Sequence, residues 1–122
     1  MLSHIVASRL RDVTSNPARR IRRLRELDVI VLTRKALCVR STDPDAWYPI
    51  TTDPDLYRAI AEERCVGCPF TGLAGPCLER ALLMEHGRPR HQIDGIAAGT
   101  TPTERIALRV ATPAQDDVEV AA

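Results

Sequence analysis

The amino-acid sequence predicts a small all-α domain organised around a centre that is held by four cysteines. Proline stands at the expected first position of four helical segments, where its fixed φ favours a helix start: Pro17, Pro54, Pro76 and Pro102. Only 3% of the 122 residues are aromatic, so the core must be built from Leu, Ile, Val and Ala. Because such a core is thin, a bound metal centre would supply much of the folding free energy.

Two helices are expected before residue 35. The first begins at a cap on Ser3 and runs to about Val13. The second begins at Pro17, behind the N-cap Asn16. The apolar stripe of the second helix consists of Ile21, Leu24 and Leu27. Arginines occupy most of its remaining surface: Arg19, Arg20, Arg22, Arg23 and Arg25.

The next segment is ambiguous. Residues 29–32 are apolar and mostly β-branched, which fits either a short strand or a buried helical turn. We expect helix to resume from Thr33 towards Cys38 and residues 41–54 to form a loop.

Two further helices flank a bend that is rich in glycine and proline. The first starts behind the N-cap Asp53 and runs to about Cys65. Residues 66–76 form the bend, and the second helix follows directly and stops at Gly87.

A glycine-bounded turn at residues 95–99 precedes the last helix. Thr101 is its expected N-cap, and Glu104 stands at the third helical position, which completes a capping box. The helix then carries Ile106, Leu108 and Val110. From Thr112 the sequence predicts a disordered acidic tail.

Charge is distributed unevenly along the chain. Residues 1–40 hold ten arginines or lysines and three acids, whereas residues 41–122 hold seven and thirteen. A basic arm on an acidic body suggests a polyanionic partner such as DNA, and it is equally compatible with an arm that folds back onto that body. We therefore divide the chain into a basic helical N-terminal extension (1–35), a cysteine-containing domain (36–111) and an acidic tail (112–122).

Four cysteines form the strongest chemical signal: Cys38, Cys65, Cys68 and Cys77. The Cys-x-x-Cys pair and the bend after it bring three thiols together locally, so that only Cys38 must arrive from elsewhere. Four thiolates suit either a tetrahedral zinc ion or an iron–sulfur cluster, and His86 or His91 could replace one zinc ligand. The spacing leaves both alternatives open.

Other classes of protein are less well supported. A thiol–disulfide oxidoreductase using Cys65 and Cys68 is a third alternative, but the βαβ context of such enzymes is absent. No Ser-His-Asp arrangement, carboxylate pair or phosphate-binding glycine loop stands out, so we expect no enzymatic activity.

No segment is long and apolar enough for a membrane span, and Arg9 and Arg11 interrupt any run that could serve as a signal peptide. We expect a cytoplasmic protein with reduced thiols and no membrane partner.

Several segments together resemble the WhiB-like family of actinobacterial iron–sulfur regulators. They cover the chain from about Ala36 to Arg105 and occur in the order that is typical of this family. The segments are Ala-Leu-Cys at 36–38, Asp-Pro-Asp-Ala-Trp-Tyr-Pro at 43–49, Arg-Cys-Val-Gly-Cys-Pro at 64–69, Cys-Leu-Glu-Arg-Ala-Leu at 77–82 and the glycine turn with its following helix start at 95–105.

The resemblance implies a [4Fe–4S] cluster ligated by the four cysteines and an all-helical fold around it. It also implies transcription regulation, usually through the DNA-contacting C-terminal domain of a principal sigma factor, with a cluster that responds to oxygen or nitric oxide. This chain departs from the family pattern in three ways. Eight residues separate Cys68 from Cys77, which is more than usual, Ala97 and Ala98 stand where the turn tryptophan is expected, and the basic tail is replaced by an acidic one.

Two further expectations concern the partner and the surroundings of the thiols. Five arginines within residues 19–25 exceed what solubility requires, so we predict that Arg19, Arg20, Arg22, Arg23 and Arg25 contact DNA phosphates. Trp47, the only tryptophan, is expected to pack near the cysteines because the preceding Asp-Pro turn holds it close to Cys38.

Overall fold

The computed structural model describes residues 4–109, and this part of the chain is helical. The α-helices are α1 (His4–Thr14), α2 (Pro17–Val31), α3 (Leu37–Arg40), α4 (Pro54–Cys65), α5 (Pro76–Met84) and α6 (Pro102–Leu108), and the short 3-10 helices are η1 (Pro44–Trp47) and η2 (Arg90–Gln92). Within residues 4–109 the only β-type pairing is an isolated bridge between Ala97 and Thr100. The predicted all-α class is therefore confirmed for the described residues.

The capping residues expected from the sequence hold three helix starts. The side chain of Asn16 accepts hydrogen bonds from two backbone amides at the start of α2, and that of Asp53 does the same at α4. At α6, Thr101 Oγ1 accepts from the Glu104 amide at 3.2 Å, while Glu104 Oε1 accepts from the Thr101 amide at 2.9 Å. These bonds satisfy amides that have no partner within the helix, so the predicted starts at Pro17, Pro54 and Pro102 are confirmed.

The segment after α2 differs from the expectation. Residues 29–31 extend α2, which settles their ambiguity in favour of helix. Helix does not resume at Thr33, however, but at Leu37. The Thr33 hydroxyl accepts a hydrogen bond from the Lys35 amide at 3.3 Å, and its carbonyl accepts from Ala36 at 3.0 Å. These local turn bonds compete with a continuous helix, and the sequence prediction underestimated them.

Two short helical turns were also missed. The predicted loop at residues 41–54 contains η1, because the Asp43 side chain accepts from the Asp45 amide and Pro44 stands at the first position. The second, η2, follows Pro89. The cap expected at Ser3 and the tail expected from Thr112 lie outside the described residues.

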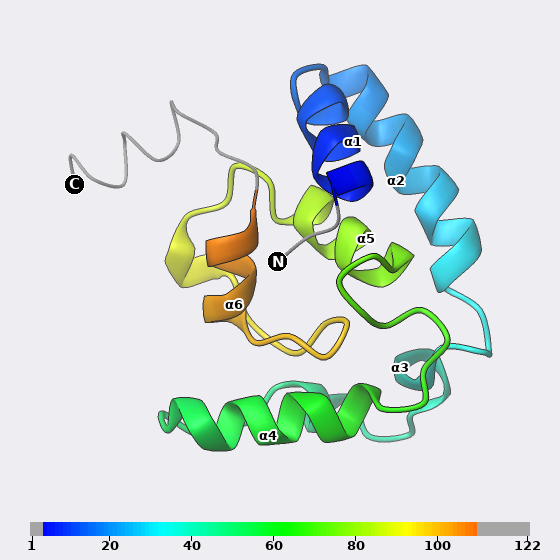
Figure 1. Ribbon diagram of the computed structural model, residues 1–122. Helices are drawn as coiled ribbons and strands as arrows, with labels where there is room; N and C mark the ends of the chain where they lie inside the picture. The colour runs from blue at the N-terminus through cyan, green and yellow to red at the C-terminus, as the bar shows by residue number, and fades with distance from the viewer. Residues whose placement is uncertain (1–3, 110–122) are drawn as a thin grey trace.

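The main core lies between α1, α2 and α5. Figure 1 shows α1 and α2 as a helical hairpin against α5, with α4 along the side of the molecule that lies farthest from this hairpin. The buried side chains of this cluster are Val6, Leu10, Val13, Leu27, Leu78, Leu82, Leu83 and Ala98. The basic segment that the sequence sets apart by its charge thus contributes about half of the residues in this cluster.

Ion pairs join α2 to α5 alongside this core. Glu79 of α5 is only 2% exposed, and its carboxylate accepts hydrogen bonds from Arg23 of α2 and Arg9 of α1. One residue further along α5, Arg80 Nε lies 2.6 Å from Oδ1 of Asp28 on α2. Residues 78–80 therefore bind α2 through both apolar and charged contacts.

Within residues 4–109, no helix combines the length and the apolar character that are needed to cross a bilayer.

Candidate metal centre

All four cysteines line one cavity of about 320 Å3. Each comes from a different local element: Cys38 is the second residue of α3, Cys65 the last of α4, Cys68 lies in the following bend, and Cys77 is the second residue of α5. Cys38 thus lines the same cavity as the other three cysteines. None of the four forms a disulfide.

Backbone hydrogen bonds fold the bend between Cys65 and Cys77. The Cys65 carbonyl accepts from the Cys68 amide at 3.0 Å, and the Phe70 carbonyl accepts from the Cys77 amide at 3.3 Å. Gly75 is required where the bend closes, because a Cβ there would lie 2.6 Å from the Phe70 carbonyl oxygen. The eight residues between Cys68 and Cys77 therefore still return the chain to the cavity.

The glycine turn at residues 95–99 forms another wall of the same cavity. Ile96, Ala97 and Ala98 line it, and a Cβ on Gly99 would lie only 3.7 Å from the Cβ of Cys65. The turn is held from behind by Arg105, which is 1% exposed. The guanidinium of Arg105 donates to the carbonyls of residues 94, 95 and 100 at 2.9 Å each, and to the Glu85 carboxylate.

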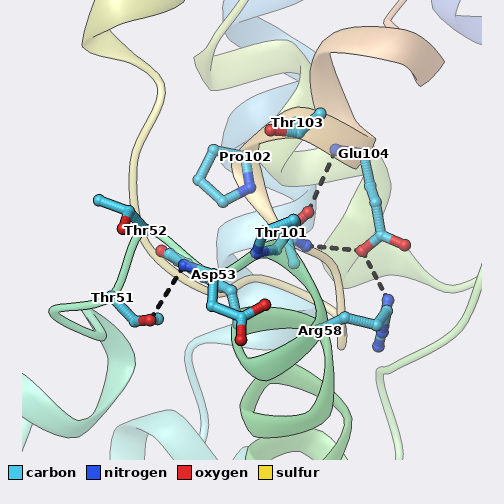
Figure 2. A pocket seen from close by; sticks show the side chains of 10 residues that line it. Thr51, Thr52, Asp53, Arg58, Thr101, Pro102, Thr103 and Glu104 are labelled. Carbon is cyan, nitrogen blue, oxygen red and sulfur yellow. Dashed lines mark hydrogen bonds and ion pairs between the residues drawn. The ribbon is translucent and has the colours of Figure 1, made fainter.

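Arg58 ties the turn to the helix that ends at Cys65. Its guanidinium donates to Glu104 Oε1 at 2.5 Å and also to the Gly99 carbonyl. Figure 2 shows this pairing beside a second cavity of about 370 Å3, where the N-terminal ends of α4 and α6 meet. The Arg58–Glu104 pair and the capping box of α6 lie at this cavity, so the start of α6 is joined to α4 here.

The environment of the thiols favours their neutral form while no cation is bound. Burial raises the pKa of the Cys77 thiol to about 11, although the Ala98 amide, which hydrogen-bonds to it, opposes the shift. Burial also raises the pKa of Cys65, and there the Gly99 amide opposes the shift. Nearby cysteines add to both shifts, because a second negative charge in the same cavity disfavours ionisation. A cationic centre would reverse this preference.

Lining one cavity is a weaker condition than forming a compact site for a single metal ion. A zinc ion needs its thiolate ligands at about 2.3 Å from one centre. In residues 4–109, no three histidine, cysteine or acidic side chains form a group that could hold a single metal ion. Neither His86 nor His91 lines the cavity.

Trp47 also lines this cavity, as the sequence predicts. Its indole Nε1 is buried, and no hydrogen-bond acceptor is found for it within the described residues. Arg80 lines the cavity as well and was not singled out from the sequence. The signal for it was available, since an arginine three positions after Cys77 lies on nearly the same face of a helix.

The five arginines predicted to contact DNA differ in their surroundings. Arg22 and Arg25 are exposed on the face of α2 that is turned away from the core, beside Ile21 and Val29. Arg19 is exposed and pairs with Asp12 at 3.3 Å. Arg20 is half-buried, near His86, whose pKa is lowered by burial and by this arginine. Arg23 is directed into the pair with Glu79.

Comparisons with known proteins add no assignment. No protein-family model matches this chain, and no match was found among curated proteins or among solved structures.

Proposed function

We propose that this protein binds a [4Fe–4S] cluster through Cys38, Cys65, Cys68 and Cys77 and regulates transcription. The observation that carries the proposal is the placement of all four thiols around one cavity. The resemblance to WhiB-like regulators supports the same ligand set. A cluster of this kind supplies redox reactivity, including sensitivity to oxygen or nitric oxide.

The donor set fits either a cluster or a single zinc ion. All four donors are soft sulfurs, which both centres accept. We propose the cluster because the resemblance to WhiB-like regulators implies it, and the metal content of the protein separates it from zinc. The Ala98 and Gly99 amides, which oppose the raised pKa of Cys77 and Cys65, are placed to stabilise negative charge on sulfur.

The contacts between α5 and α2 supply a route from the cavity to the arginine helix. Arg80 lines the cavity and pairs with Asp28, and Glu79 beside it pairs with Arg23. A change in charge or ligation at Cys77 therefore acts on the helix that carries the exposed Arg22 and Arg25. We propose that DNA phosphates contact this helix, and that a principal sigma factor is a second partner, as the resemblance implies.

Purification without air tests the centre directly. We expect a coloured protein that contains iron and sulfide in the ratio of the proposed cluster, roughly four of each per chain, and loss of both in Cys→Ser variants at the four positions. A colourless protein with one zinc ion per chain would instead support a zinc-stabilised binding module without redox sensing. Dithiol turnover that is abolished in Cys65→Ser would support the oxidoreductase alternative.

A further inference from the structure

Two arginines on the outer face of α2 have no ionic partner in the described part of the chain: Arg22 and Arg25. The acids that helix geometry brings within their reach are already engaged. Glu26, four positions after Arg22, pairs with another arginine of α2. Asp28, three positions after Arg25, pairs with an arginine of α5. In this structure, a protein group that neutralises the two arginines must therefore come from outside residues 4–109.

Exposed apolar side chains stand in the same stripe of the helix. Ile21 and Val29 line one open hollow with the two arginines, because residues three, four and seven positions apart share a helix face. Val29 is 78% exposed and Ile21 49%. DNA phosphates would neutralise the arginines but would leave these aliphatic side chains without an apolar partner. A segment that combines acids with aliphatic residues fits this surface better.

We propose that the acidic tail (112–122) lies on this face of α2, where it neutralises Arg22 and Arg25 and competes with DNA. The tail contains three acids, no basic residue and two valines that alternate with the acids. The acids are Asp116, Asp117 and Glu119, and the valines are Val118 and Val120. The contact itself does not depend on the proposed function, whereas the competition with DNA rests on it.

The chain leaves the described fold close enough to α2 for this contact. Burial lowers the pKa of His86, and the positive charges of Arg20 and Arg109 add to this shift, so both guanidinium groups lie near the same imidazole. Seven residues lead from Arg109 to Asp116, which is up to about 25 Å of extended chain. The route from Arg20 to Arg25 covers a rise of about 7.5 Å and, around the helix, a diameter of about 10–12 Å. The acids of the tail can therefore reach the outer face.

Tethering makes such a contact effective although each ion pair is weak. An exposed ion pair contributes little by itself and is screened by salt. A segment on the same chain, however, acts at an effective concentration on the order of millimolar. We therefore expect the contact to be intramolecular and sensitive to salt.

The test compares amide NMR spectra of the full chain, prepared without air, as wild type and as Asp116→Asn/Asp117→Asn. We expect the spectra to differ at residues 18–29, because the variant weakens the pairs with Arg22 and Arg25. Raising the NaCl concentration to about 1 M should move the wild-type resonances of α2 towards those of the variant, since salt screens exposed charges.

A matched control and a reciprocal variant separate this contact from a general effect of charge. Glu62→Gln/Glu63→Gln removes the same charge from exposed positions on α4 and should leave the resonances of α2 unchanged. In an Arg22→Ala/Arg25→Ala background, the tail change should cause no further shift at residues 18–29. Identical α2 resonances in wild type and tail variant would overturn the inference. Resonances of α2 that shift on dilution would also overturn it, because they would assign the contact to a second copy of the chain.

DNA affinity gives the functional readout. In fluorescence anisotropy with duplex DNA, Asp116→Asn/Asp117→Asn should bind about threefold more tightly than Glu62→Gln/Glu63→Gln, which corresponds to the loss of one or two exposed ion pairs. Equal affinities would overturn the competition. A failure of all variants to bind DNA would overturn the DNA role in the proposed function, while the contact would still be decided by the amide resonances.

Discussion

Arg23 of α2 and Glu79 of α5 form a two-point ion pair across 56 residues of sequence, with Nε to Oε2 at 2.6 Å and Nη2 to Oε1 at 3.0 Å. Glu79 is buried, and the hydrogen bond to its carboxylate, which outweighs the opposing effect of burial, raises the pKa of Arg23 above its usual value. The pair holds the helix that begins next to Cys77 against the helix that carries the arginines.

Glu79→Gln is therefore expected to destabilise the fold by about 3 kcal/mol, because it leaves the positive charge of Arg23 partly buried without a counter-charge. Urea denaturation followed by circular dichroism measures the change in the free energy of unfolding. Glu26→Gln is the matched control, since Glu26 pairs with the same arginine at 3.0 Å but is exposed, and it should cost less than about 1 kcal/mol. Equal losses of unfolding free energy in the two variants would show that the buried pair stabilises the fold no more than the exposed pair does.

The raised thiol pKa values predict how the metal-free protein responds to alkali. The pKa of Cys77 rises from 9.0 to about 11 in the folded protein, so this thiol binds its proton more tightly when folded. Its contribution to stability is present below pH 9 and is lost as the pH rises towards 11. At about 1.36 kcal/mol per pKa unit, the loss is roughly 2–3 kcal/mol. Thermal unfolding of the metal-free protein across this range should show this loss, and Cys77→Ser should reduce it.

Alkylation provides a second readout of the same shift. Only the thiolate reacts with iodoacetamide. At pH 8 the exposed Cys38 should be modified first and Cys77 last in the metal-free protein. Mass spectrometry of timed samples gives the order, and early modification of Cys77 would contradict the expected protection.

Gly95 is expected to be far less tolerant of a side chain than Gly87. Both residues have a positive φ, +78° and +79°, so an alanine at either position carries a similar backbone cost of about 1 kcal/mol. A Cβ at Gly95 would also lie 2.7 Å from Cε1 of Tyr48, whereas a Cβ at Gly87 meets nothing within 4 Å. Gly95→Ala should therefore lower the melting temperature more than Gly87→Ala does. Similar melting temperatures would mean that the Tyr48 ring moves easily away from the glycine turn.

For DNA binding, the two arginines on the outer face of α2 are the informative ones. Replacing Arg22 and Arg25 with Ala should reduce the slope of log affinity against log salt by about 0.9 for each phosphate that is no longer neutralised. Arg64→Ala is the control, because Arg64 lies on α4 and donates to the Ala46 carbonyl. Fluorescence anisotropy with duplex DNA at several salt concentrations measures the slope. An unchanged slope in the double variant would leave these arginines without a role in phosphate binding.

The sequence predicted the local features of this fold better than its long-range contacts. Proline at the first position and a capping side chain before it mark the starts of α2, α4 and α6, because these signals act within one turn of helix. The proximity of three cysteines follows from the short bend for the same reason. Cys38 was placed with them on grounds of chemistry and resemblance, since nothing local connects α3 to α5.

The long-range pairs between side chains depend on the tertiary packing. The acid Glu79 stands next to Leu78 in a helix with a buried apolar face, which indicates a buried pair, but the sequence offers no means of choosing Arg23 among five neighbouring arginines. The hydrogen bonds from Arg105 to three backbone carbonyls could not be predicted either, because they depend on how the glycine turn folds back over α6. The orphan N–H of Trp47 is likewise visible only after packing.

Because α1 and α2 complete the cluster around α5, the arginine-rich segment cannot be treated as a detachable appendage. A shortened polypeptide that begins at Ala36 would expose Leu78 and Leu82 to solvent. It would also leave the Glu79 carboxylate without the guanidinium groups of Arg9 and Arg23. We expect such a fragment to aggregate on expression. Exchange of this segment with that of another protein would succeed only if α5 were transplanted together with it.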